Sequence, residues 1–180
     1  MFLMLASGVF ALVASNAAWA QAAKPKPAVA ASGQALMVLL ETASRWQAFS
    51  AQPNAPKLCY ALSKAVSRQP ANLKDVEGLL FVSTRPGQGV RNEISLVMNF
   101  DLKEDVEHQA VVGDQRYAMA AKGKHLFLKN PAEEPRMLDA MRRGSELEIK
   151  ATSKRGNATA DKYALAGVAQ AVKRAEEACK

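Results

Sequence analysis

The 180-residue chain has the length of a single domain preceded by a short additional segment. Hydrophobic residues make up 49% and charged residues 23%, a composition that excludes an intrinsically disordered protein. The net charge of +7 favours anionic partners. No long block of basic residues and no interleaved aromatic residues occur, so nucleic acid is a disfavoured partner.

Residues 1–20 predict a signal peptide. They carry no charge, are largely apolar and end in Ala18-Trp19-Ala20, a pattern typical of a signal-peptidase site. The basic N-terminal region that is typical of a signal peptide is missing, because the first lysine is Lys24. An uncleaved anchor is the alternative, because the apolar stretch is long enough to cross a bilayer, although its polar residues and the Ala-x-Ala triplet weigh against it. We therefore expect cleavage after Ala20 and export to the periplasm, the outer envelope or the medium.

Residues 21–43 divide into a linker and a short apolar segment. Residues 21–34 are rich in Ala, Pro and Lys and lack an apolar period, which is typical of a linker. Residues 35–43 are apolar but too short to span a membrane, and we expect one or two helical turns there. A single domain is therefore expected over 44–180, with no integral membrane span after cleavage.

Short segments of alternating polarity predict strands along most of the domain. Ile94, Leu96, Met98 and Phe100 show the period of two most clearly, and Gly-containing turns separate several segments. The expected strands lie within residues 45–51, 57–63, 79–85, 91–100, 108–112, 116–121, 125–129, 146–152 and 161–167.

Two segments predict helices. Residues 132–143 form a short amphipathic stretch with acidic residues at its start and basic residues followed by Gly144 at its end. Residues 167–178 carry apolar residues at helical spacing and predict a C-terminal helix. Because strands come in runs without strict alternation with helices, we expect a mainly β (α+β) fold. It would be an antiparallel β-sandwich or a curled barrel-like sheet.

The two cysteines, Cys59 and Cys179, are predicted to form a disulfide. An even number of thiols in an exported protein indicates pairing, and two thiols are too few for a structural zinc site. Their separation excludes a CxxC redox motif. Two independent buried thiols are the alternative. The disulfide would join the C-terminal helix to an early strand and close nearly the whole domain.

No motif of a catalytic or cofactor site occurs in the sequence. The H-E-x-x-H, G-x-S-x-G, P-loop and Rossmann glycine patterns are all missing. His108 begins a predicted strand and His125 lies beside a predicted turn, so we expect both to be half-exposed strand residues. We therefore expect no catalytic residue, no metal and no cofactor. A periplasmic hydrolase or isomerase with an unrecognised site is the alternative.

Six basic residues form the candidate patch for an anionic surface. They end the first predicted helix or lie on the strand pair that follows it: Arg142, Arg143, Lys150, Lys154, Arg155 and Lys162. If they share one face, the domain should bind anionic lipid or polysaccharide. The alternative is a lysine-bearing sheet edge that discourages aggregation.

Eight short segments follow one another in a characteristic order along the domain. They are R-W-Q-A-F at 45–49, L-C-Y at 58–60, F-V-S-T-R-P-G at 81–87, V-R-N-E-I-S at 90–95, N-P-A-E-E-P at 130–135, M-R-R-G-S at 141–145, T-S-K-R-G at 152–156 and Y-A-L-A-G-V-A-Q-A at 163–171. This order resembles the invasion-associated locus B family of exported Gram-negative proteins and covers residues 44–179. Many members carry a further cysteine shortly after the tryptophan, where Phe49 and Ser50 stand here. Any pairing scheme shared by the family is therefore not carried over.

The resemblance implies a protein of the periplasm or outer envelope of a Gram-negative bacterium. The family is named for a role in host-cell entry in some pathogens and offers no catalytic residues to carry over. We therefore expect a non-enzymatic binding or structural role, linked to host-cell interaction where the bacterium invades. The expected partner is an envelope component or another protein.

Overall fold

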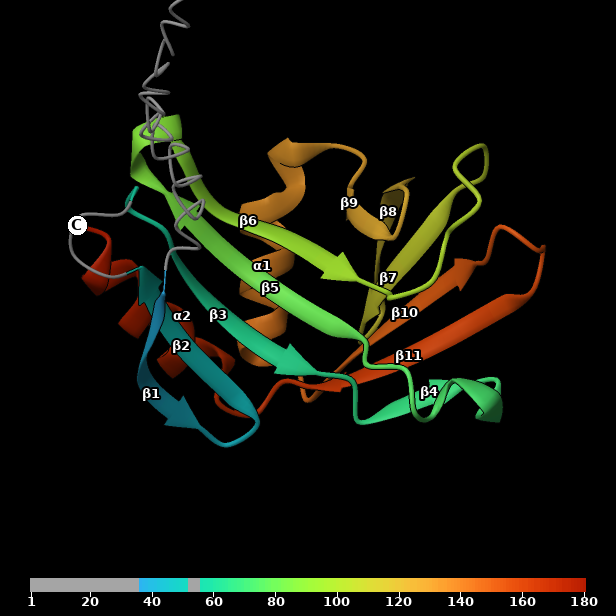
Figure 1. Cartoon of the computed structure of the whole chain (residues 1–180), viewed down its shortest axis with the longest axis horizontal. Coiled ribbons are helices and arrows are strands. Elements are labelled where there is room, and N and C mark those ends of the chain that lie inside the picture. The colour runs from blue at the N-terminus through green and yellow to red at the C-terminus, as the bar shows by residue number, and fades with distance from the viewer. Residues whose placement is uncertain (1–35, 52–55) are drawn as a thin grey trace, which may run out of the picture. The chain divides into compact units, whose positions relative to one another are not determined.

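The computed structural model describes residues 36–51 and 56–180, and the structural statements below concern these residues. Within them, eleven strands form one sheet in the order β1-β2-β3-β5-β6-β9-β8-β7-β10-β11-β4 (Figure 1). Every strand pair is antiparallel. The mainly β fold class is confirmed. The predicted signal peptide and linker lie outside the described residues.

Apart from β1 and β4, the strands and helices fall close to the segments that the sequence predicts. The strands are β1 (Met37–Ala43), β2 (Trp46–Ala51), β3 (Cys59–Lys64), β4 (Ser67–Gln69), β5 (Leu79–Arg85), β6 (Val90–Val97), β7 (His108–Val112), β8 (Gln115–Lys122), β9 (His125–Leu128), β10 (Glu146–Thr152) and β11 (Ala158–Ala164). The helices are α1 (Glu134–Arg143) and α2 (Val168–Ala178), and three 3-10 helices lie at Ala71–Leu73, Pro86–Gln88 and Pro131–Glu133. Both predicted helices are confirmed.

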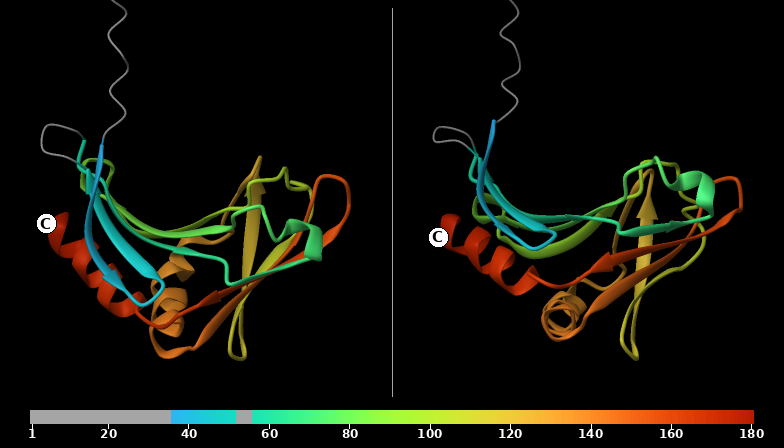
Figure 2. Two further views of the ribbon diagram at one scale, coloured as in Figure 1. Left: turned by 60° about the horizontal axis from the view of Figure 1, so that its bottom comes forward. Right: turned by 90° about the horizontal axis from the view of Figure 1, so that it is seen from below.

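The sheet is strongly curved and open, with β1 and β4 at its two ends. Figure 2 shows the strands bending across the molecule, so the observed arrangement is the curled sheet, one of the two that the sequence predicts. Helix α2 packs on β1, β2 and β3, and helix α1 packs on β6 and β7. In Figure 1 both helices lie behind the first strands of the sheet, where they cover its core face.

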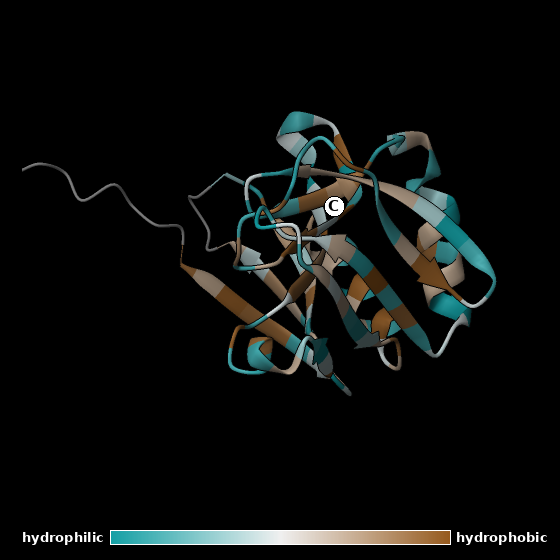
Figure 3. Cartoon of the chain, turned by 90° about the vertical axis from the view of Figure 1, so that its right-hand side faces the viewer, coloured by the Kyte–Doolittle hydropathy of each residue, from teal (hydrophilic) through white to brown (hydrophobic). Residues whose placement is uncertain are grey.

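The core follows from the alternation of side chains along each strand. In β3, Cys59 and Ala61 are buried whereas Tyr60 and Leu62 are partly exposed. Figure 3 shows hydrophobic and hydrophilic residues interspersed along the strand ribbons. Trp46 is fully buried, and its Nε1 donates a hydrogen bond of 2.9 Å to the carbonyl of Ala164. This bond fastens β2 to the end of β11.

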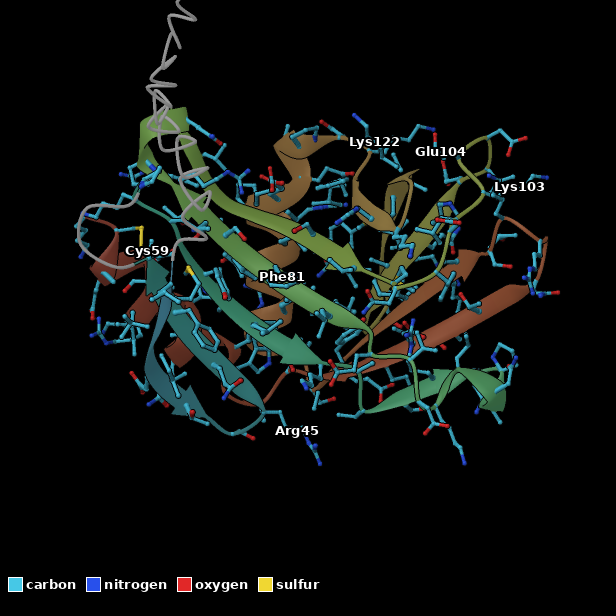
Figure 4. The ribbon with its side chains drawn as sticks, in the orientation of Figure 1. Arg45, Cys59, Phe81, Lys103, Glu104 and Lys122 are labelled. Atoms are coloured by element: carbon cyan, nitrogen blue, oxygen red, sulfur yellow. A yellow bond between two sulfur atoms is a disulfide. The ribbon has the colours of Figure 1, made fainter. Side chains whose placement is uncertain are left out.

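Three aromatic rings lie on the opposite face of the sheet. The ring centroids of Phe49 and Tyr60 are 5.1 Å apart, and those of Tyr60 and Phe81 are 5.5 Å apart. Figure 4 shows Phe81 on the face of β5 that is turned away from the helices. Burial raises the pKa of the Tyr60 hydroxyl, as expected for a phenol packed between two rings.

The expectation of helical turns at 35–43 is wrong, because residues 37–43 form the edge strand β1. The N-terminal end of α2 meets this strand at Gly167, which has a φ of 95°. A Cβ atom at this position would lie 2.0 Å from the carbonyl oxygen of Ala43. Only glycine allows the helix to approach β1 so closely, and this contact fixes the edge strand against the domain.

Candidate anion-binding groove

A cavity of about 420 Å³ opens where several turns meet at one end of the sheet. The loop that follows β4 contributes Pro70, Asn72 and Leu73, and the chain after β6 contributes Phe100 and Asp101. The β8–β9 turn contributes Lys124, and the β10–β11 turn contributes Ser153, Lys154, Arg155 and Asn157. We call this cavity the basic groove. Four segments that are far apart in the sequence therefore build it together.

Backbone hydrogen bonds hold the turns of the basic groove in place. Leu102 and Ser153 form an isolated antiparallel bridge, and the amide of Lys154 donates to the carbonyl of Asp101 at 2.8 Å. The amide of Leu102 donates to the carbonyl of Gly123 at 2.9 Å. A carboxylate oxygen of Glu104 accepts a bond of 2.6 Å from the Gly123 amide. Figure 4 shows Glu104 and Lys103 on the loop at this end of the molecule.

His108 lies behind the same turns and is buried, with 1% of its surface exposed. Its Nδ1 accepts a 3.2 Å bond from the Thr152 amide, and its Nε2 lies 2.9 Å from the carbonyl of Lys103. Since Nδ1 accepts a hydrogen bond, the ring proton resides on Nε2, which donates to that carbonyl. The expectation of a half-exposed His108 is wrong, because the imidazole joins the end of β10 to the loop at Lys103 inside the protein. His125 is exposed.

Three cations line the basic groove without acidic partners. Within residues 36–51 and 56–180, Lys124, Lys154 and Arg155 form no ion pair. One acidic side chain, Asp101, stands among the lining residues, so the lining carries a net charge of +2 (three cations less one acid). Positive charge in a concave surface attracts an anion more effectively than the same charge on a flat one.

The other predicted patch residues lie elsewhere, and most of them are paired. Lys150 lies 3.2 Å from Glu148 and Lys162 lies 2.8 Å from Glu146, both on the outer face of β10 and β11. The hydrogen bond to Glu146 raises the pKa of Lys162. Arg142 contacts Asp139 at 3.3 Å and Glu176 at 3.7 Å, and Arg143 is exposed at the end of α1.

The six predicted residues therefore do not form one patch. Arg142 and Arg143 precede β10, whereas Lys154 and Arg155 follow it, and a strand of seven residues separates the two pairs. At about 3.3 Å per residue this strand spans roughly 20 Å. That distance is about twice the screening length of roughly 8–10 Å at ordinary ionic strength. The structure joins Lys154 and Arg155 to Lys124, which the sequence does not single out.

A buried ion pair lies next to the basic groove. Arg68 of β4 donates from Nε to Asp161 Oδ1 at 2.9 Å and from Nη2 to Oδ2 at 2.7 Å. Burial raises the pKa of Asp161, and the bonds from Arg68 oppose that shift. Burial also raises the pKa of Tyr163, whose hydroxyl has no hydrogen-bond partner among the described residues. The pair joins β4 to β11 and is closed to solvent.

In 36–51 and 56–180, no three His, Cys, Asp or Glu side chains are grouped so that they could hold a metal ion. No helix in this part of the chain is long and apolar enough to cross a membrane. The predicted disulfide is present: Cys59 and Cys179 are bonded, with their Cα atoms 5.9 Å apart.

Comparison with known proteins gives one informative result. No protein-family model and no curated protein matches the sequence. The crystal structure of invasion associated protein B from Bartonella henselae has a similar fold, with a TM-score of 0.51 and 16% sequence identity. The similarity covers 79% of this chain and 96% of that protein. At this identity the comparison establishes a shared fold, and it supports the family resemblance seen in the sequence.

Proposed function

We propose that this chain is an exported, non-enzymatic protein of the bacterial envelope that binds anionic envelope material through the basic groove. The observation that carries the proposal is the set of unpaired cations, Lys124, Lys154 and Arg155, in a cavity of about 420 Å³. Most other basic residues of the predicted patch already have acidic partners. Unpaired charge in a concave site is typical of anion recognition.

The chemistry of the lining favours binding over catalysis. Among residues 36–51 and 56–180, no histidine or cysteine lines the basic groove. Ser153 of the lining accepts a hydrogen bond of 3.1 Å from the Asn157 amide, and its hydroxyl donates to no side chain in this part of the chain. A nucleophile without a base is a weak one. The resemblance in fold to a protein described as invasion associated supports a role at the bacterial surface, where contact with a host cell would occur.

Binding to lipopolysaccharide, an anionic component of Gram-negative envelopes, should depend on salt and on the groove cations. The Lys154→Gln/Arg155→Gln variant removes two unpaired cations, and we expect about tenfold weaker binding, since each exposed ion pair is worth at most about 1 kcal/mol. Raising NaCl from about 50 to about 300 mM should weaken binding of the parent by screening. Co-sedimentation with lipopolysaccharide measures both effects.

The matched control is Lys150→Gln/Lys162→Gln, which removes the same charge from residues paired with Glu148 and Glu146. The control should bind as the parent does. Equal losses in the two variants would show that only net charge matters, and unchanged binding in the groove variant would remove the basis of the proposal.

Export predicts that the mature chain begins at Gln21, because the Ala18-Trp19-Ala20 triplet precedes a linker that carries the first lysine. Mass spectrometry of the protein from a periplasmic or secreted fraction should give the mass of residues 21–180. A chain that keeps Met1 and fractionates with the inner membrane would contradict export and favour the anchor.

A further inference from the structure

One wall of the basic groove is an aromatic ring, although the lining is otherwise mostly polar. Phe100 lines the cavity together with Lys124, Lys154 and Arg155, and it also packs against the hydrophobic core. A ring that is only partly buried leaves part of its surface for a ligand. Charge alone does not explain an aromatic residue at this position.

The ring of Phe100 is held in place by the buried ion pair beside it. The guanidinium carbon of Arg68 lies 5.4 Å from the ring centroid, within the range of a cation–π contact. Arg68 is fixed in turn by its two bonds to Asp161. Arg68 is not among the residues that line the cavity, whereas Phe100 is. A rigid ring loses little conformational freedom when a ligand stacks on it.

The remaining lining residues can form hydrogen bonds with hydroxyl groups. Asn72 and Asn157 line the cavity, and an amide side chain offers both donors and acceptors. Besides Phe100, the apolar lining residues are Pro70 and Leu73, and the other lining residues are polar or charged. The volume lies within the range of roughly 300–1,000 Å³ that is usual for small-ligand sites.

We propose that the basic groove binds an acidic sugar, as found in anionic envelope polysaccharides, with the sugar ring stacked on Phe100. The acid group lies among Lys124, Lys154 and Arg155, and the ring hydroxyls bond to the asparagine side chains. A pyranose ring is apolar on its C–H faces and polar at its rim, which matches an aromatic wall surrounded by amides and cations. This inference rests on the proposed function and specifies its ligand.

The test compares three probes by isothermal titration calorimetry with the mature protein. Trigalacturonic acid has sugar rings and carboxylates, its methyl ester has the rings without charge, and citrate has carboxylates without a ring. We expect trigalacturonic acid to bind more tightly than citrate, and the methyl ester to bind at least tenfold more weakly than the acid. Phe100→Leu should weaken binding of trigalacturonic acid about three- to tenfold and leave citrate unchanged, since an aromatic contact is worth about 0.5–1.5 kcal/mol.

Two further variants control for the aromatic ring. Phe100→Tyr keeps the ring and should bind trigalacturonic acid like the parent. Phe81→Leu removes an aromatic ring from the far face of the sheet and should also leave binding unchanged (Figure 4). If Phe100→Leu melts at a lower temperature, NMR on the parent decides, because stacking requires an intermolecular nuclear Overhauser effect between the Phe100 ring protons and the sugar ring protons.

The outcomes separate this inference from the proposed function. Citrate that binds as tightly as trigalacturonic acid would overturn the proposal of a sugar ligand and leave an anion site. A Phe100→Leu variant that keeps its affinity for trigalacturonic acid would do the same. Lipopolysaccharide binding that persists both in the Lys154→Gln/Arg155→Gln variant and at high salt would overturn the proposed function itself. Binding of anionic phosphatidylglycerol vesicles without binding of trigalacturonic acid would assign the groove to lipid and overturn the sugar.

Discussion

Removing the disulfide between Cys59 and Cys179 is expected to lower the free energy of unfolding by about 4–5 kcal/mol. The bond joins residues separated by 120 positions, and closing a loop of this length restricts the unfolded chain strongly. A domain of this size has a net stability of about 5–15 kcal/mol, so the loss is a large share of it. The melting temperature should fall by roughly 10–20 °C.

The disulfide also decides how α2 is attached to the sheet. Cys179 follows the last residue of α2, Cys59 begins β3, and both are buried. The bond therefore pins the end of the helix whose beginning meets β1 at Gly167. Without it, the last turn of α2 is expected to open first, which hydrogen exchange of its amides would detect.

The appropriate variant is Cys59→Ala/Cys179→Ala, because alanine leaves no polar group in the buried site. Calorimetry of the parent and the variant measures the loss. A reductant should lower the melting temperature of the parent and leave the variant unchanged. Two reactive thiols in the folded, oxidised parent, or a variant that melts within a few degrees of the parent, would contradict the pairing.

Local patterns in the sequence predict most of the sheet, because a buried face imposes a period of two wherever the strand has one exposed side. The segment 79–85 matches β5 residue for residue, and both helices begin within two residues of the expected positions. Turn residues also identify hairpins correctly. Gly113 and Gly123, with φ angles of 57° and 60°, lie in the turns between β7, β8 and β9.

The two end strands of the sheet, β1 and β4, could not be predicted in this way, for physical reasons. In β1 both faces carry apolar residues, and Val38 and Leu39 are 41% and 49% exposed, so no alternation marks the strand. A short apolar run of this kind does not distinguish a helix from a strand. In β4 only three residues pair, and the pairing depends on the contact between Arg68 and Asp161, which are 93 positions apart.

The residues of the basic groove could also be predicted only in part from the sequence. Lys154 and Arg155 could be singled out because they are neighbours in a basic stretch of sequence. Lys124 and Phe100 reach the groove from other turns, and no local pattern joins them to it. Conversely, Lys150 pairs with Glu148 of its own strand, and Lys162 pairs with Glu146 of the neighbouring strand, 16 positions away. The basic residues that are grouped in the sequence therefore predict a larger patch than the structure contains. The register of the strands determines which of these side chains lie together.

The second large effect is expected at Asp161, whose replacement by alanine should cost about 3–5 kcal/mol. The side chains of Arg68 and Asp161 are 4% and 0% exposed, and two hydrogen bonds join them. Asp161→Ala leaves the guanidinium buried without a counter-charge, and an unpaired buried charge is strongly destabilising. Gly78 closes the site, since a Cβ atom there would lie 3.0 Å from Asp161 Oδ2.

Urea denaturation of a double-mutant cycle separates the pair from its surroundings. Arg68→Met should also be costly, because it leaves the carboxylate unpaired and removes the bond of 3.2 Å to the Met98 carbonyl. The Arg68→Met/Asp161→Ala variant should lose clearly less stability than the two single losses combined, since no charge then remains buried. Lys162→Ala, next in sequence but in an exposed pair, is the control and should cost at most about 1 kcal/mol. Additive losses in the cycle, or an Asp161→Ala variant as stable as the control, would show that the pair does not hold β4 against β11.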